Sequence, residues 1–178
     1  REFWLGGGPA LDREIRDRFL GHYDRAAAGE CENWTSDARS WIALIVLLDQ
    51  FPRNIFRGDK QSFAADPLVR EYARRLVASP LHAELITVEK VFAYLPYEHS
   101  EDINDQKKCV ALYRALEPHV AKDEWIEFAV QHYDIIRQFG RFPHRNNILG
   151  RENTPEEAAW LASSDQHFGT AVTEDDGG

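Results

Sequence analysis

The run WIALIVLL, residues 41–48, decides the fold of this 178-residue chain. The cluster TSD at residues 35–37 supplies a helix N-cap, and no Gly or Pro interrupts the sequence from there to Phe51. A helix that is apolar on every side has to be covered on every side. The sequence therefore predicts a central buried helix, with a buried strand through residues 42–48 as the alternative. In the helix, we expect full burial of Trp41, Leu44, Ile45 and Leu48.

On both sides of this run, apolar residues recur at helical spacing between turn signals. The spacing and the caps predict an all-α fold of about seven helices in antiparallel pairs, similar to a tetratricopeptide-like bundle or short solenoid. We expect one helical domain over residues 1–170 and a disordered acidic tail over residues 171–178. Besides the central helix, we predict helices from Leu11 to before Gly29, from Asp66 to Ser79 and from Ile103 to Pro118. A further helix runs through Val88 and stops at Leu95 and Pro96, and another runs from Trp125 to Phe139 behind a cap at Asp123. The last helix starts at the TPEE capping box, residues 154–157.

Composition excludes several classes of protein. The net charge of −9 argues against binding to nucleic acid or to an anionic membrane, because a phosphate surface requires a basic face. The longest apolar run is far shorter than the roughly 18 residues of a membrane span, and no export signal precedes it, so we expect a cytoplasmic protein. The two cysteines, Cys31 and Cys109, have no framework spacing and are expected to be buried thiols.

Positive charge is concentrated in the stretch HYDIIRQFGRFPHRNNILGR, residues 132–151. Four Arg against the single Asp give it a formal charge of +3, within a chain of net charge −9. Gly140 can close the preceding helix in the left-handed conformation, and Pro143 forces an extended turn. A loop rich in Arg, His and Asn at a helix end is typical of a site that receives an anion.

A second stretch repeats this turn. DQFPRN, residues 49–54, ends an apolar helical run and shares Phe-Pro followed by Arg-Asn with FPHRN, residues 142–146. Arg offers a rigid fork of donors, Pro fixes the turn and Asn tolerates it. We expect the two loops to lie together at one end of the bundle.

Three interpretations of these polar residues stay open. They form a lattice of Arg-carboxylate pairs that ties helix ends together, a site for a small carboxylate or phosphate in which His side chains also transfer protons, or a metal site. No residue is assigned as a metal ligand, and the sequence identifies no cofactor. The catalytic candidates are His99, Glu101, His132 and His144. The ligand-binding candidates are Asp49, Arg53, Asn54, Arg141, Arg145 and Asn146.

Three motifs in the same order resemble the uncharacterised bacterial family called domain of unknown function 924. They are LDQFPRN at residues 48–54, PYEHSE at residues 96–101, and residues 132–157, and the resemblance covers residues 3–162. It implies an all-helical fold similar to tetratricopeptide-repeat proteins and carries over no activity, substrate or cofactor. Two functions therefore remain: a binder of, or enzyme acting on, a small anionic molecule, and a scaffold that holds a protein partner in a concave groove.

Overall fold

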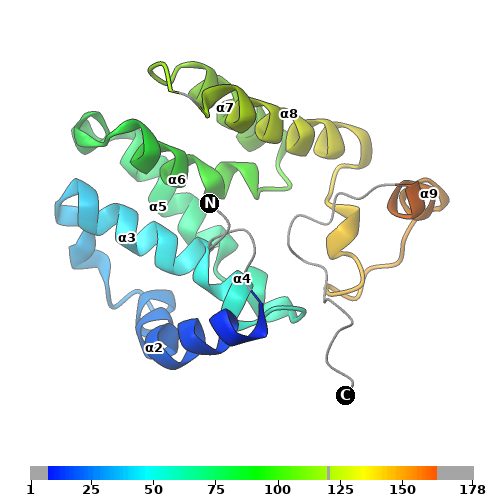
Figure 1. The fold of residues 1–178 in the computed structure, drawn as a ribbon, viewed down its shortest axis with the longest axis horizontal. Helices are drawn as coiled ribbons and strands as arrows, with labels where there is room; N and C mark the ends of the chain where they lie inside the picture. The colour runs from blue at the N-terminus through cyan, green and yellow to red at the C-terminus, as the bar shows by residue number, and fades with distance from the viewer. Residues whose placement is uncertain (1–7, 120, 164–178) are drawn as a thin grey trace.

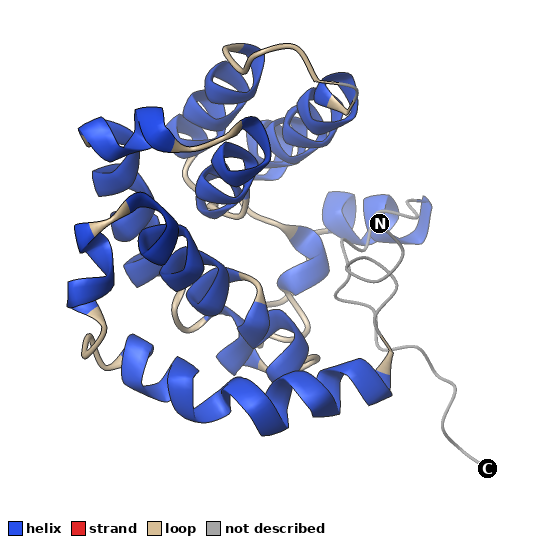
Figure 2. Cartoon of the chain, turned by 60° about the vertical axis from the view of Figure 1, so that its left-hand side comes forward, coloured by secondary structure: helices blue, strands red, loops and turns tan. Residues whose placement is uncertain are grey.

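A computed structural model describes residues 8–119 and 121–163. Helix accounts for 75% of the structure, and the described residues contain no strand (Figure 2). This confirms the all-α fold, and the alternative of a strand at residues 42–48 is wrong. The helices of nine or more residues are α2 (Pro9–Ala27), α3 (Ala38–Asp49), α5 (Asp66–Ala78), α6 (Thr87–Glu98), α7 (Ile103–Arg114), α8 (Lys122–Phe139) and α9 (Pro155–Ser163). The shorter elements are α4 (Phe51–Ile55) and the 3-10 helices η1 (Glu32–Ser36), η2 (Lys60–Phe63), η3 (Pro80–Glu84) and η4 (Pro143–Arg145).

The apolar helix α3 lies at the centre of the main core. The Asp37 carboxylate caps it by accepting from the backbone N–H groups of Arg39 and Ser40, at 3.1 and 3.0 Å. Helices α2, α4, α5 and α6 all pack against α3 (Figure 1). Its residues Trp41, Leu44, Ile45 and Leu48 are buried, as predicted.

Two prolines shape the helix ends that carry the polar motifs. Pro52 stands in the first turn of α4, directly after α3, because a proline lacks the N–H group that would continue the previous helix. The prediction that Pro96 stops its helix is wrong: α6 continues to Glu98, and His99 is its C-cap. The missing N–H of Pro96 removes one helical hydrogen bond, and α6 continues for two residues beyond it. These ends place Asp49, Arg53 and His99 close together in space.

The chain then runs through the α7–α8 pair into a turn that begins at Gly140. Gly140 has a φ of 70°, so it closes α8 in the left-handed conformation, as predicted. The following η4 and α9 lie beside the main body (Figure 1). The predicted capping box starts α9: the hydroxyl of Thr154 accepts from the Glu157 N–H at 3.2 Å, and the Glu157 carboxylate accepts from the Thr154 N–H at 2.8 Å.

None of the helices that the structure describes combines the length and apolar character needed to cross a bilayer. Both cysteines, Cys31 and Cys109, are buried free thiols. The predicted acidic tail, residues 171–178, lies outside the described residues. The closer likeness to tetratricopeptide-repeat proteins stays a prediction.

Candidate functional site

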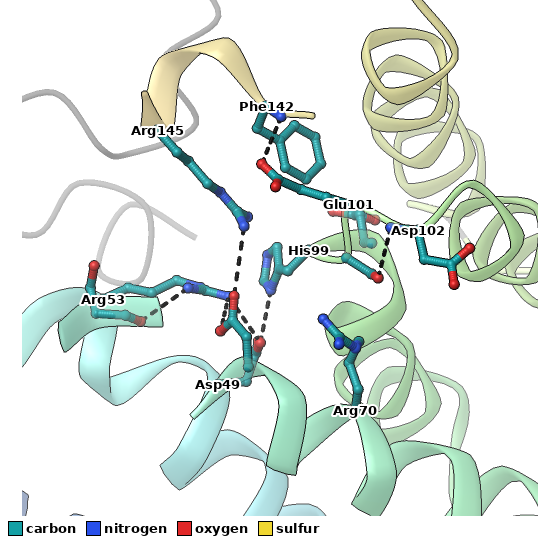
Figure 3. A network of polar contacts seen from close by, with 12 residues as sticks. Asp49, Arg53, Arg70, His99, Glu101, Asp102, Phe142 and Arg145 are labelled. Carbon is teal, nitrogen blue, oxygen red and sulfur yellow. Dashed lines mark hydrogen bonds and ion pairs between the residues drawn. The ribbon is translucent and has the colours of Figure 1, made fainter. Parts of the chain in front are cut away.

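The carboxylate of Asp49, at the last residue of α3, is the centre of a buried polar cluster. Asp49 is only 1% exposed. Its Oδ1 accepts from Arg53 Nη2 at 3.2 Å and lies 2.8 Å from His99 Nδ1. Figure 3 shows these side chains converging from three helix ends, with Arg145 reaching toward them from η4. The polar motifs that the sequence places at separate helix ends therefore meet at one point.

A second carboxylate, Asp66 at the start of α5, joins the two Arg-Asn loops. Arg53 Nη2 donates to Asp66 Oδ1 at 3.2 Å, and Arg145 Nη1 lies 3.6 Å from Asp66 Oδ2. Two guanidinium groups that contact one carboxylate belong to loops at the same end of the bundle. This confirms the prediction that the stretches around Pro52 and Pro143 lie together.

Arg145 is buried without a close protein acceptor. Only 6% of it is exposed, and its guanidinium carbon lies 4.7 and 4.4 Å from the ring centroids of Phe63 and Phe142. Within residues 8–119 and 121–163, its side-chain nitrogens have no acceptor at hydrogen-bond distance; the nearest contact is the 3.6 Å ion pair to Asp66. Burial, aided by the charge of Arg53, lowers the pKa of Arg145 to about 10. The group stays cationic at neutral pH.

His99 lies against Asp49 and is kept neutral by its burial. Burial would raise the pKa of Asp49, but the interactions with His99 and with the charge of Arg53 outweigh it and hold that pKa well below the usual range. Burial lowers the pKa of His99, and the positive charges of Arg53 and Arg145 add to this effect against the attraction of Asp49. An ionised carboxylate can only accept, so His99 Nδ1 carries the proton and Nε2 is the basic nitrogen.

A second histidine and a buried acid lie behind His99. The ring of His132 is 6.4 Å from that of His99, and its Nδ1 donates to the Phe128 carbonyl at 2.8 Å. Burial lowers the pKa of His132 to about 3. Glu98 Oε1 is 3.8 Å from His132 Nδ1, and burial raises the pKa of Glu98 to about 8 even though the Tyr113 hydroxyl donates to it. Both groups are therefore uncharged at neutral pH.

The remaining candidates form a structural lattice beside this cluster. Arg141 donates to both oxygens of Glu157, at 2.6 and 2.7 Å, and Asn146 Nδ2 donates to the same carboxylate at 3.2 Å. Asn54 donates to Asp12 at 2.9 Å, on the far side of α4. These side chains have carboxylate partners, so the lattice interpretation fits them.

Glu101 and His144 border the cluster. Glu101 accepts from the backbone N–H of Phe142 at 2.8 Å and from both Nη groups of Arg151, at 2.8 and 3.0 Å. The ring of His144 lies 5.3 Å from that of Phe142. Both residues support Phe142, whose ring centroid lies 4.4 Å from the guanidinium carbon of Arg145.

Sequence reasoning missed the residues that complete the cluster. Asp66 has the sequence context of a helix start before Pro67, and Phe63 that of an ordinary apolar residue, so neither suggested a contact with Arg145. Glu98 stands inside the PYEHSE motif, but nothing in the sequence shows its burial. Only the fold brings these residues to the loop at residues 142–146.

The structure does not support the metal interpretation. In the described part of the chain, no group of three or more His, Cys, Asp or Glu side chains is placed to hold an ion. The His and Glu side chains among the catalytic candidates, His99, Glu101, His132 and His144, contact separate partners.

Comparison with known proteins gives the same fold and no activity. A solved structure, that of a protein of unknown function from Agrobacterium tumefaciens, is similar at a TM-score of 0.84 and 39% identity, covering 92% of this chain and 90% of the other. No curated protein matches the sequence. The family described as "Bacterial protein of unknown function (DUF924)" matches residues 1–165, and the chain belongs to that family.

Proposed function

We propose that the protein binds a small anion at Arg145, beside Arg53 and His99. The observation that carries the proposal is the buried guanidinium of Arg145, which has no acceptor at hydrogen-bond distance among the described residues. Burying a charged donor without a partner is costly, and guanidinium groups in proteins normally find carboxylates or phosphates. An anionic ligand would supply the missing acceptor.

The way in which the arginines pair with the carboxylates supports this assignment. Arg53 takes the close contacts with both Asp49 and Asp66, at 3.2 Å each, and leaves Arg145 the 3.6 Å contact. By contrast, Arg141 and Arg151 each hold one carboxylate through two hydrogen bonds. Among the described residues, Arg145 therefore differs from Arg141 and Arg151 in making no hydrogen bond to a carboxylate, its contact with Asp66 being a 3.6 Å ion pair.

His99 gives the site a means of proton transfer. Asp49 orients its ring through Nδ1, so the basic Nε2 faces away from Asp49. A histidine oriented by a carboxylate is a common general base. We include proton transfer to or from a bound anion in the proposal, with His99 as the acting group and Asp49 as the positioning residue.

Binding of a protein partner is the second candidate. The large apolar side chains exposed in the described residues are Ile86, Val88 and Phe128, the last 50% exposed. They offer a partner some apolar surface, but Arg145 faces the buried cluster rather than this surface. The anion proposal accounts for Arg145, and the partner proposal does not.

The test compares wild type with Arg145→Ala. Mass spectrometry of the purified protein identifies any retained small molecule, and a thermal-shift screen of carboxylates and phosphates follows. We expect Arg145→Ala to weaken the binding of the strongest anion by at least about tenfold, near 1.4 kcal/mol. Arg137→Ala is the control, because Arg137 is exposed on α8 and its loss removes the same charge away from the site.

The lattice interpretation predicts the opposite result. If Arg145 only neutralises Asp66, its removal lowers the melting temperature strongly and changes the affinity for no anion. A destabilised variant, with no anion bound by either form, would end the proposal.

A further inference from the structure

We propose that the anion is a carboxylate, bound in plane by the side edge of Arg145. The inference rests on the proposed function and adds the chemical class of the ligand. Phosphate, a tetrahedral dianion, is the alternative that it excludes.

The donors of Arg145 favour a ligand at an edge of its guanidinium. The centroids of the Phe63 and Phe142 rings lie 4.7 and 4.4 Å from the guanidinium carbon. The N–H bonds of a guanidinium lie in its plane, so an acceptor for them approaches in that plane. A planar carboxylate matches that direction, because two parallel N–H···O bonds keep both groups in one plane.

One particular edge lacks partners. Nη1 is the nitrogen closest to Asp66, whereas Nε is buried and has no acceptor among the described residues. Nε and Nη2 together form the side fork of an arginine. Leaving a buried donor unsatisfied costs about 1–3 kcal/mol, so an acceptor on this fork has a clear energetic advantage.

The charge of the cluster favours a monoanion. Arg53 and Arg145 contribute +2, Asp49 and Asp66 contribute −2, and the sum of these four groups is zero. A carboxylate brings this sum to −1, whereas a phosphate dianion brings it to −2. An excess of negative charge costs more free energy in a buried site than in water, because like charges repel more strongly there.

The helix ends around the cluster also favour a monoanion over a dianion. Helix α3 ends at Asp49 and helix α6 ends at Glu98, so both turn their C-terminal, partially negative ends toward the site. The N-terminal end of α5, which would attract an anion, already carries Asp66. Phosphate sites in proteins usually combine Arg with an open helix N-terminus or a surplus of positive charge, whereas here Asp66 occupies the N-terminus of α5 and the four charges sum to zero.

The experiment titrates the full-length wild-type protein with three probes at pH 8 and equal ionic strength. Acetate is a planar monoanion, methyl sulfate a tetrahedral monoanion, and inorganic phosphate mainly a tetrahedral dianion. We expect acetate to bind at least about tenfold more tightly than phosphate. Methyl sulfate, which has the right charge and the wrong shape, should bind more weakly than acetate. The NMR signal of Arg145 Nε–H reports binding at the proposed edge.

Arg145→Lys keeps the charge but removes the planar fork, and it avoids the large volume loss of Arg145→Ala. We expect this variant to lose the preference for acetate over methyl sulfate, while Arg137→Lys keeps it. Phosphate binding tighter than acetate, with loss in Arg145→Lys, would overturn the carboxylate inference and leave anion binding intact. Binding of none of the probes or screened anions would overturn both.

Discussion

Glu98 is a buried acid whose protonation makes folding stability depend on pH. It is 6% exposed, and burial raises its pKa from 4.5 to about 8. Because the folded-state pKa lies above the unfolded one, the folded state holds this proton where the unfolded state has lost it. The contribution of Glu98 to stability is therefore complete below pH 4.5 and decreases as the pH rises toward 8, by at most about 1.4 kcal/mol per pH unit.

Glu98→Gln tests this assignment, because the amide resembles the protonated acid and does not ionise. We expect the variant to gain stability relative to wild type as the pH rises from 5 to 8, with no further gain above pH 8. Urea unfolding at each pH measures the difference. Glu101→Gln is the control, because the pKa of Glu101 is lowered rather than raised. This variant should show the opposite trend, gaining stability relative to wild type as the pH falls. A difference between Glu98→Gln and wild type that does not vary with pH contradicts the assignment.

At the residue scale, the sequence predicted which side chains belong to the cluster better than it predicted which groups they contact. Asp49, Arg53, His99 and Arg145 do meet, because the sequence places each at or near a helix end, and His132 joins them from the middle of α8. Other candidates bind carboxylates that the sequence could not associate with them, as the pairing of Arg141 with Glu157 and of Asn54 with Asp12 shows. Which carboxylate a given arginine contacts depends on how the helices pack, and no spacing rule along the chain contains that information.

Helix α3 should be the element whose packing matters most for stability. Leu44 of α3 is completely buried against the neighbouring helices. We expect Leu44→Ala to reduce the free energy of unfolding by about 2–5 kcal/mol, because the surroundings of a central helix cannot collapse onto the cavity. Val46→Ala, on the partly exposed side of the same helix, should cost clearly less. Denaturant unfolding that shows a loss below about 1 kcal/mol for Leu44→Ala would place α3 at the periphery.

Helix α9 is anchored by one residue, Glu157. This carboxylate completes the capping box with Thr154, and it also accepts from Arg141 and Asn146 in the loop before the helix. Glu157→Gln weakens the charge-assisted bonds, each worth about 1.5–3 kcal/mol, so we expect α9 amides to exchange with solvent roughly ten to a hundred times faster. Glu156→Gln changes the neighbouring exposed carboxylate and should leave exchange nearly unchanged. Equal exchange in both variants would show that apolar contacts alone hold α9.

The sequence predicted the elements well because caps and apolar spacing act locally. Asp37, Gly140 and the Thr154 capping box all fix the ends that the sequence predicts. There are two exceptions. The prediction that Asp123 caps its helix is wrong, because α8 begins at Lys122 with Ala121 as its N-cap. The helix of Pro96 continues to Glu98. Burial of the last turn of α6 against the core stabilises it despite the missing bond, and that burial is a tertiary effect which local signals do not report.

As a whole, the described molecule has a large core around α3 and a small one at its C-terminal side. The small core consists of Ile135, Ile136 and Phe142, with Ile103, Phe139 and Trp160 packed against it. Polar contacts of Arg145 and Phe142, to Asp66 and Glu101 respectively, link the segment from η4 to α9 with the main body. The proposed anion site lies on this link, so binding and the attachment of the segment should be coupled.

This coupling gives a prediction for hydrogen exchange across the molecule. An opening that detaches residues 142–163 withdraws Arg145 from Phe63 and Asp66 and must release the anion. A ligand present at a hundredfold excess over its Kd stabilises the closed form by about 2.7 kcal/mol, so amides that exchange through this opening should exchange about a hundredfold more slowly. Saturating acetate is compared with chloride at equal ionic strength.

The control region for this measurement is η3, which packs against α3 and α5 away from the link. Its local openings leave Arg145 in place, so acetate should not slow its exchange. Arg145→Lys should lose the slowing at residues 142–163 and keep the behaviour of η3. Equal slowing in both regions would mean a general effect of acetate on the protein, and no slowing at residues 142–163 despite measured binding would mean that the anion does not join the segment to the main body.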